Sequence, residues 1–149
     1  MYKSFHCWVK RHLKKGSSIL ELGNGEGTEY LSRWYTMHSV EHDPYWMRYN
    51  THYIKAQIID GWYSVDVLKK ELPKIEYDLL IIDGPPGTIG RFKFIENINL
   101  FNIDVPIVID DTTRKDESLI ADYITLKLKT RKGIEFSEQS TSRKFTVIA

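Results

Sequence analysis

The sequence has a single cysteine and no long apolar run. One cysteine, Cys7, excludes an internal disulfide framework and a zinc site built from several cysteines, and we expect it to be a small core residue. No apolar stretch approaches the ~20 residues that a membrane helix needs. Residues 1–12 mix basic and aromatic residues and lack the apolar segment of a secretory signal. These absences predict a cytoplasmic protein that does not enter a membrane.

An excess of either charge is also missing. Lys and Arg number 21 and Asp and Glu number 20, so the net charge is +1. A charge this small does not favour binding to nucleic acid or to an anionic membrane, and we interpret the basic stretch 10–15 as a solvated helix face. Hydrophobic residues make up 42% of the chain, which is enough for a packed core. The length predicts one domain, residues 1–149.

Short apolar runs alternate with longer amphipathic segments. Predicted strands cover 18–22, 38–41, 53–59, 77–82 and 105–109, and the run 77–82 is the most apolar. Predicted helices cover 27–35, a segment beginning at Asp43–Pro44, 65–72, 92–101 and 116–129, with one more helix within 1–15. Residues 134–139 and 144–148 read as a C-terminal hairpin. The fold class is therefore α/β: a doubly wound, mostly parallel Rossmann-like sheet with a C-terminal antiparallel hairpin.

A glycine-rich loop follows the first predicted strand, with the sequence ELGNGEGT over residues 21–28. Ligands of such sheets bind beyond the carboxyl ends of the strands, and glycines let the backbone approach them closely. The third glycine of the dinucleotide motif would fall at Thr28, which is not glycine. Glu21 places a carboxylate where a pyrophosphate would be repelled, so a cationic ligand fits better. A tight turn without a ligand is the alternative.

The pattern E-x-G-x-G-x-G resembles motif I of class I S-adenosylmethionine-dependent methyltransferases. Glu21, Glu41 and Asp83 stand at three predicted strand ends in the order found in that family, and the resemblance covers essentially the whole chain. The segments SVEHDPYW (39–46) and DGPP (83–86) are similar to small methyltransferase-like proteins. The resemblance implies S-adenosylmethionine as the cofactor. It also implies that the cofactor loop contains Glu21, Gly23, Gly25, Gly27 and Thr28.

The same resemblance assigns further cofactor contacts. It implies that Glu41 accepts hydrogen bonds from both ribose hydroxyls and that His42 lies beside the adenine, although His42 could equally be a surface residue. After the third strand, Asp60 could accept from the adenine amino group and Trp62 could stack on the ring. The alternatives for these two residues are a helix cap and a core aromatic. Asp43, followed by Pro44, is a good helix N-cap.

Three aspartates follow the fourth and fifth predicted strands, at Asp83, Asp110 and Asp111. Their order resembles metal-dependent O-methyltransferases of the catechol type and related sugar O-methyltransferases. The resemblance implies that the three residues bind Mg²⁺, with Asp83 catalytic, and that the metal lowers the pKa of a substrate hydroxyl. The alternative is that Asp83 faces the cationic groups of the cofactor. Asp110 and Asp111 would then cap the next helix or hold the turn.

The chain departs from these families at two points. No lysine follows Asp83 closely, so the general base stays open between a metal-bound alkoxide, Arg91, His6 and His12. Gly87 stands where amino-methyltransferases have an aromatic residue, which argues against methylation of DNA bases.

We expect methyl transfer to an oxygen of a small molecule of the sugar or phenol type. The alternatives are a non-catalytic S-adenosylmethionine-binding or scaffold domain and a nicotinamide-dinucleotide-binding domain. The segments around the predicted site are short, so a homodimer could complete it.

Overall fold

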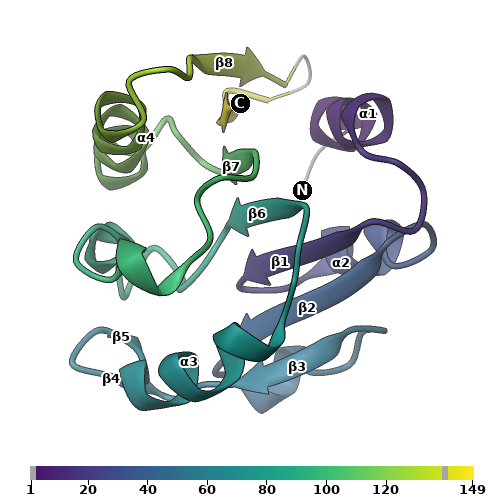
Figure 1. Cartoon of the computed structure of the whole chain (residues 1–149), viewed down its shortest axis with the longest axis vertical. Coiled ribbons are helices and arrows are strands. Elements are labelled where there is room, and N and C mark those ends of the chain that lie inside the picture. The colour runs from purple at the N-terminus through teal and green to yellow at the C-terminus, as the bar shows by residue number, and fades with distance from the viewer. Residues whose placement is uncertain (1–2, 139–140) are drawn as a thin grey trace.

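The computed structural model describes residues 3–138 and 141–149 (Figure 1). Met1 and Tyr2 of the predicted first helix and Gln139 of the predicted hairpin lie outside the described residues. None of the described helices is both long and apolar enough to cross a membrane.

A seven-stranded sheet forms the centre of the fold, in the order β3-β2-β1-β6-β7-β9-β8. Strands β1, β2, β3, β6 and β7 are parallel, and β9 is antiparallel to both β7 and β8. The arrowheads of β1, β2 and β6 therefore point the same way in Figure 1. The bounds are β1 Ser18–Leu22, β2 Thr36–Glu41, β3 His52–Lys55, β6 Leu79–Ile82, β7 Ile107–Ile109, β8 Gly133–Ser137 and β9 Lys144–Ile148. The predicted fold class and the central strand are confirmed.

Both faces of the central strands are buried, and neighbouring residues of each strand point to opposite sides. Leu20, Leu80 and Ile107 pack on the side of α3 (Val65–Glu71) and α4 (Lys115–Lys127). Ile19, Ile81 and Val108 pack on the side of α1 (Lys3–His12) and α2 (Glu26–Leu31). This arrangement explains why β6 and β7 are continuously apolar in sequence.

Several predicted elements differ from the structure. The helix expected from Asp43–Pro44 is a single 3₁₀ turn, η1 (Pro44–Trp46), in which Asp43 accepts from the Tyr45 N–H as the predicted cap. The strand expected over 53–59 is divided. Beyond β3, Ile58–Ile59 (β4) pairs with Trp62–Tyr63 (β5) in a separate hairpin. In addition, α2 ends at Leu31 instead of continuing to Tyr35.

The helix expected over 92–101 is two 3₁₀ turns, η3 (Phe92–Phe94) and η4 (Ile98–Leu100). Phe94, Ile98 and Phe101 are buried at helical spacing, which explains the prediction. Between the turns, the Lys93 carbonyl accepts from both the side chain and the backbone N–H of Asn97, at 2.9 and 3.3 Å. Another 3₁₀ turn, η2 (Leu72–Lys74), follows α3. Cys7 is exposed on α1, so its assignment to the core was wrong.

Candidate functional site

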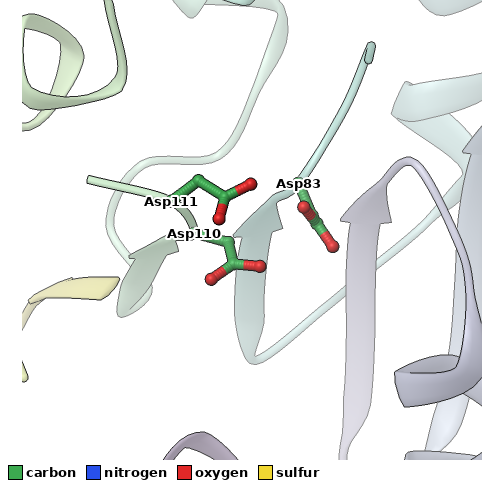
Figure 2. Close-up of side chains that lie close together, drawn as sticks. All are labelled: Asp83, Asp110 and Asp111. Atoms are coloured by element: carbon green, nitrogen blue, oxygen red, sulfur yellow. The ribbon is translucent and has the colours of Figure 1, made fainter. Parts of the chain in front are cut away.

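The carboxyl ends of β1, β2, β6 and β7 meet at one edge of the sheet, and most of the predicted site residues lie there. Glu21 lies within β1 and Glu41 ends β2. Asp83 directly follows β6, and Asp110 directly follows β7. Figure 2 shows the carboxylates of Asp83, Asp110 and Asp111 gathered at the ends of these two neighbouring strands.

Glu21 is fully buried and joins the glycine loop to β2. Its Oε1 accepts from the hydroxyls of Thr28 at 2.7 Å and Ser39 at 2.5 Å. Thr28 in turn accepts from the Gly25 N–H at 3.0 Å. Burial raises the pKa of Glu21 to about 8, and the hydroxyl hydrogen bonds only partly oppose this shift. Thr28 therefore supports the loop from within, and the second oxygen of Glu21 is left without a bond.

The loop glycines serve two different purposes. Gly23 has φ +77°, and a Cβ placed there would lie 2.9 Å from the Gly84 Cα, so only glycine lets these two loops pass closely. Gly25 has an extended backbone with φ −179°, which any residue can adopt, and a Cβ there would meet no atom within 4 Å. The space beside Gly25 is therefore open. Gly27 is buried within α2.

Glu41 is only 3% exposed, and backbone amides hold its carboxylate. Its Oε1 accepts from the His42 N–H at 2.7 Å and the Asp43 N–H at 2.9 Å. Its Oε2 accepts from the Asn24 N–H of the glycine loop at 3.2 Å. These bonds fix the ends of β1 and β2 relative to each other and orient the carboxylate.

Buried polar atoms without hydrogen-bond partners occur at this edge. Among the described residues they include Glu21 Oε2, Asn24 Oδ1 and the Tyr63 hydroxyl. The Tyr63 hydroxyl lies against Gly84, and burial, together with the charge of Glu41, raises its pKa well above the ordinary value. A buried polar atom without a partner costs about 1–3 kcal/mol, so these atoms favour binding of a ligand that supplies hydrogen-bond partners. The sequence prediction missed Tyr63, although it lies beside Trp62.

The other predicted adenine contacts are arranged differently. Asp60 is exposed at the tip of the β4–β5 hairpin with φ +51°, and Trp62 is a core aromatic, 2% exposed, packed against Phe94. Trp62 therefore matches the alternative of a core aromatic, and neither residue lines the cleft described next. A cleft of about 370 Å³ lies beside His42, the residue that follows Glu41. Its lining includes His42, Pro44, Met47, Ala56, Ile59, Ser64 and Val67. His42 also contacts the Tyr63 ring edge-on, with centroids 6.2 Å apart.

Asp83, Asp110 and Asp111 form an acidic cluster in which one oxygen from each residue lies within 4.8 Å of the others. Burial and the charge of Asp110 raise the pKa of Asp83 to about 7. Burial and the charge of Asp111 likewise raise the pKa of Asp110. Oxygen ligands at this spacing are suited to a divalent cation such as Mg²⁺. The proposed capping role is not observed, because the N-cap of α4 is Arg114.

Arg91, which is 3% exposed, compensates the negative charge of the cluster. Its guanidinium donates to the Asp83 carboxylate at 3.1 Å and to the carbonyls of Asp83 and Pro85 at 2.7 and 3.0 Å. It also donates to the Asp110 carbonyl at 3.3 Å. Arg91 therefore joins the loops that follow β6 and β7. A guanidinium stays protonated at any ordinary pH, so Arg91 is unsuited to act as the general base.

The two histidines considered as bases are engaged in α1. The His6 ring stacks on Tyr30 with centroids 4.1 Å apart, and the His12 ring stacks on Trp8 at 4.4 Å. Burial lowers the pKa of His6 to about 4. The general base is therefore better sought among the carboxylates of the edge.

Comparisons with known proteins identify the fold. No protein-family model and no curated protein sequence matches the chain. An rRNA methylase from Streptococcus thermophilus superposes with a TM-score of 0.62 at 13% identity, covering 97% of this chain and 93% of that chain. A precorrin 8w decarboxylase from Methanobacterium thermoautotrophicum has a TM-score of 0.61 at 10% identity, covering 100% and 90%.

A third similar structure is the MycE methyltransferase of mycinamycin biosynthesis, solved with Mg, S-adenosylhomocysteine and mycinamycin VI. Its TM-score is 0.53 at 14% identity, and the match covers 95% of this chain and 45% of that one. The chain has the class I methyltransferase fold. Identities this low establish the fold, whereas the reaction has to be argued from the site.

Proposed function

We propose that the protein binds S-adenosylmethionine at the carboxyl edge of its sheet and transfers the methyl group to an oxygen of a small molecule. The observation that carries this proposal is the set of buried, unpartnered polar atoms beside the glycine loop, contributed by Glu21, Asn24 and Tyr63. A ligand that carries an ammonium, a sulfonium and several hydroxyl groups offers partners for such atoms. The fold and the MycE complex with S-adenosylhomocysteine support the same cofactor.

Each part of the cofactor has a group suited to it. The Glu41 carboxylate would accept from the ribose hydroxyls, and the cleft beside His42 has the size and apolar lining that an adenine ring requires. The open space at Gly25 would admit the methionine part. Glu21 and Asp83 would lie near the ammonium and sulfonium, whose positive charge would favour the ionised form of both carboxylates. This assignment replaces Asp60 and Trp62 with the cleft residues as the adenine contacts.

Asp83 is the proposed catalytic residue. With a pKa of about 7 it can hold or release a proton near neutral pH, which suits a group that takes the proton of an acceptor hydroxyl. Arg91 fixes its orientation through the carboxylate and the carbonyl. The methyl group would then pass in line from sulfur to the acceptor oxygen.

A divalent cation fits the same cluster. Asp83, Asp110 and Asp111 would hold Mg²⁺, which when bound would lower the pKa of the acceptor hydroxyl. Asp111 already lies near three arginines, so the cation would compete with existing ion pairs. MycE was solved with Mg, which favours testing the metal directly.

Calorimetry with S-adenosylmethionine, S-adenosylhomocysteine and NAD tests the proposal. We expect both sulfur compounds to bind and NAD not to bind. Preferential binding of NAD would favour the dinucleotide alternative and overturn the proposal. Binding of S-adenosylhomocysteine without methyl transfer to any sugar or phenol would leave the non-catalytic alternative. The small-molecule acceptor, the cytoplasmic location, the single domain and the homodimer stay predictions that this experiment does not address.

A further inference from the structure

Two half-exposed arginines lie above the buried acids of the site. The side chains of Arg114 and Arg143 are 45% and 50% exposed, whereas those of Asp111 and Glu117 are 8% and 3% exposed. Arg114 lies 3.1 Å from one oxygen of Asp111, and Arg143 lies 3.8 Å from the other. The solvent-facing groups around Asp111 are therefore cationic, and the carboxylates lie beneath them.

Three separate segments position these arginines. Arg114 directly precedes α4, and Arg143 directly precedes β9. The Thr112 N–H donates to the Lys144 carbonyl at 2.9 Å, which ties the turn after β7 to the start of β9. The loop after β6 leaves room for the guanidinium, since a Cβ on Gly87 would lie 2.7 Å from Arg114 Nη1. The arginines are thus held at the side of the site where Asp83 and Asp110 lie.

We propose that the methyl acceptor carries an anionic group, a carboxylate or a phosphate, which Arg114 and Arg143 bind while the reacting hydroxyl lies at Asp83. This inference rests on the proposed function. Planar guanidinium groups recognise carboxylates and phosphates through paired hydrogen bonds. Asp111 contacts both arginines, and its carboxylate lies within 4.8 Å of those of Asp83 and Asp110. The anion and the hydroxyl would therefore lie a few bonds apart on one small molecule.

The experiment compares acids with their neutral counterparts. Protein loaded with S-adenosylhomocysteine is titrated with methyl glucuronoside against methyl glucoside, 3,4-dihydroxybenzoate against catechol, and glucose 6-phosphate against glucose. We expect the acid of at least one pair to bind at least tenfold more tightly, and the pair concerned separates carboxylate from phosphate. Arg114→Gln and Arg143→Gln should each remove most of that preference and leave the affinity for S-adenosylhomocysteine unchanged.

Matched variants keep the test independent of folding. Lys115→Gln removes an exposed cation next to Arg114 and should leave the preference intact. Arg114→Lys keeps the charge but not the forked geometry, so it should retain part of the preference even if Arg114→Gln unfolds. Equal affinity for acid and neutral ligands in the wild type, or no binding in any pair, overturns the proposal. Failure of the wild type to bind S-adenosylhomocysteine instead overturns the proposed function.

Discussion

Replacement of Glu41 by alanine should weaken cofactor binding and destabilise the free protein, because the carboxylate has two roles. Toward the cofactor it would accept from the ribose hydroxyls, and hydrogen bonds to a charged acceptor contribute about 1.5–3 kcal/mol. This free energy corresponds to a loss of roughly 10- to 150-fold in affinity for S-adenosylhomocysteine. Within the protein, Glu41 accepts three backbone N–H groups at 2.7, 2.9 and 3.2 Å. Their loss should cost about 1–3 kcal/mol of unfolding free energy.

The assay measures both quantities on the same variants. Calorimetry gives the affinity for S-adenosylhomocysteine, and urea unfolding without ligand gives the stability. Asp78→Ala is the matched control, since Asp78 also accepts a backbone N–H, that of Ser18 at 2.9 Å, but lies at the opposite end of β1. It should lower stability and leave affinity unchanged. A Glu41→Ala protein that loses stability yet binds S-adenosylhomocysteine normally would show that Glu41 only supports the loops, and the ribose assignment would be wrong.

Further predictions concern the glycine loop, the buried acid and the metal. Gly25→Val should abolish S-adenosylhomocysteine binding without lowering the melting temperature, because the backbone there is extended and the side chain enters open space; normal affinity by calorimetry would mean that the loop is only a turn. Burial raises the pKa of Glu21 from 4.5 to about 8, so the folded protein holds a proton that the unfolded chain releases in this range. The stability of the free protein should fall as pH rises from about 4.5 through 8, and Glu21→Gln should flatten that decline in urea unfolding measured across the range; equal slopes for both proteins would contradict it. If the aspartates hold Mg²⁺ as proposed, EDTA and Asp111→Asn should each abolish methyl transfer; EDTA-resistant activity with an active variant would leave Asp83 as a contact of the cofactor's cationic groups.

The sheet could be predicted because its strands are buried on both faces. The strands β1 and β6 could be recognised from their apolar runs alone, without knowing which strands they pair with. The alternation of strands with helices was enough to predict a parallel sheet. The hairpin was predicted from its polar turn. The position of β9 between β7 and β8 depends on long-range strand pairing, which no local sequence pattern predicts.

The irregular elements were less predictable for a physical reason. Phe94, Ile98 and Phe101 have the spacing of a helix and are buried accordingly, yet the backbone forms two 3₁₀ turns. Burial fixes which side chains point inward, and both an α-helix and successive 3₁₀ turns can satisfy that requirement. Periodicity alone cannot separate these outcomes.

Within the candidate site, the strand-end acids could be placed from sequence because parallel strands end at the same edge. Glu41 and the three aspartates gather there. The groups that compensate or complete them were not predictable in this way. Arg91 reaches the acids from an irregular loop, and Tyr63 comes from a two-stranded hairpin outside the main sheet. Their positions depend on tertiary packing, so the sequence showed which residues they are but not that they reach the site.

The proposed cofactor groups and the proposed acceptor groups come from different parts of the chain. The groups proposed for the cofactor come from residues 21–83, on the β3-β2-β1-β6 part of the sheet. The arginines proposed for the acceptor, Arg114 and Arg143, directly precede α4 and β9. Asp83 lies between them, since it is proposed to face both the cofactor and the acceptor hydroxyl. Under the proposed function, substitutions around Arg114 and Arg143 would change which molecule is methylated and leave the cofactor site intact. With this arrangement, acceptor specificity would be able to change during evolution while cofactor binding is retained.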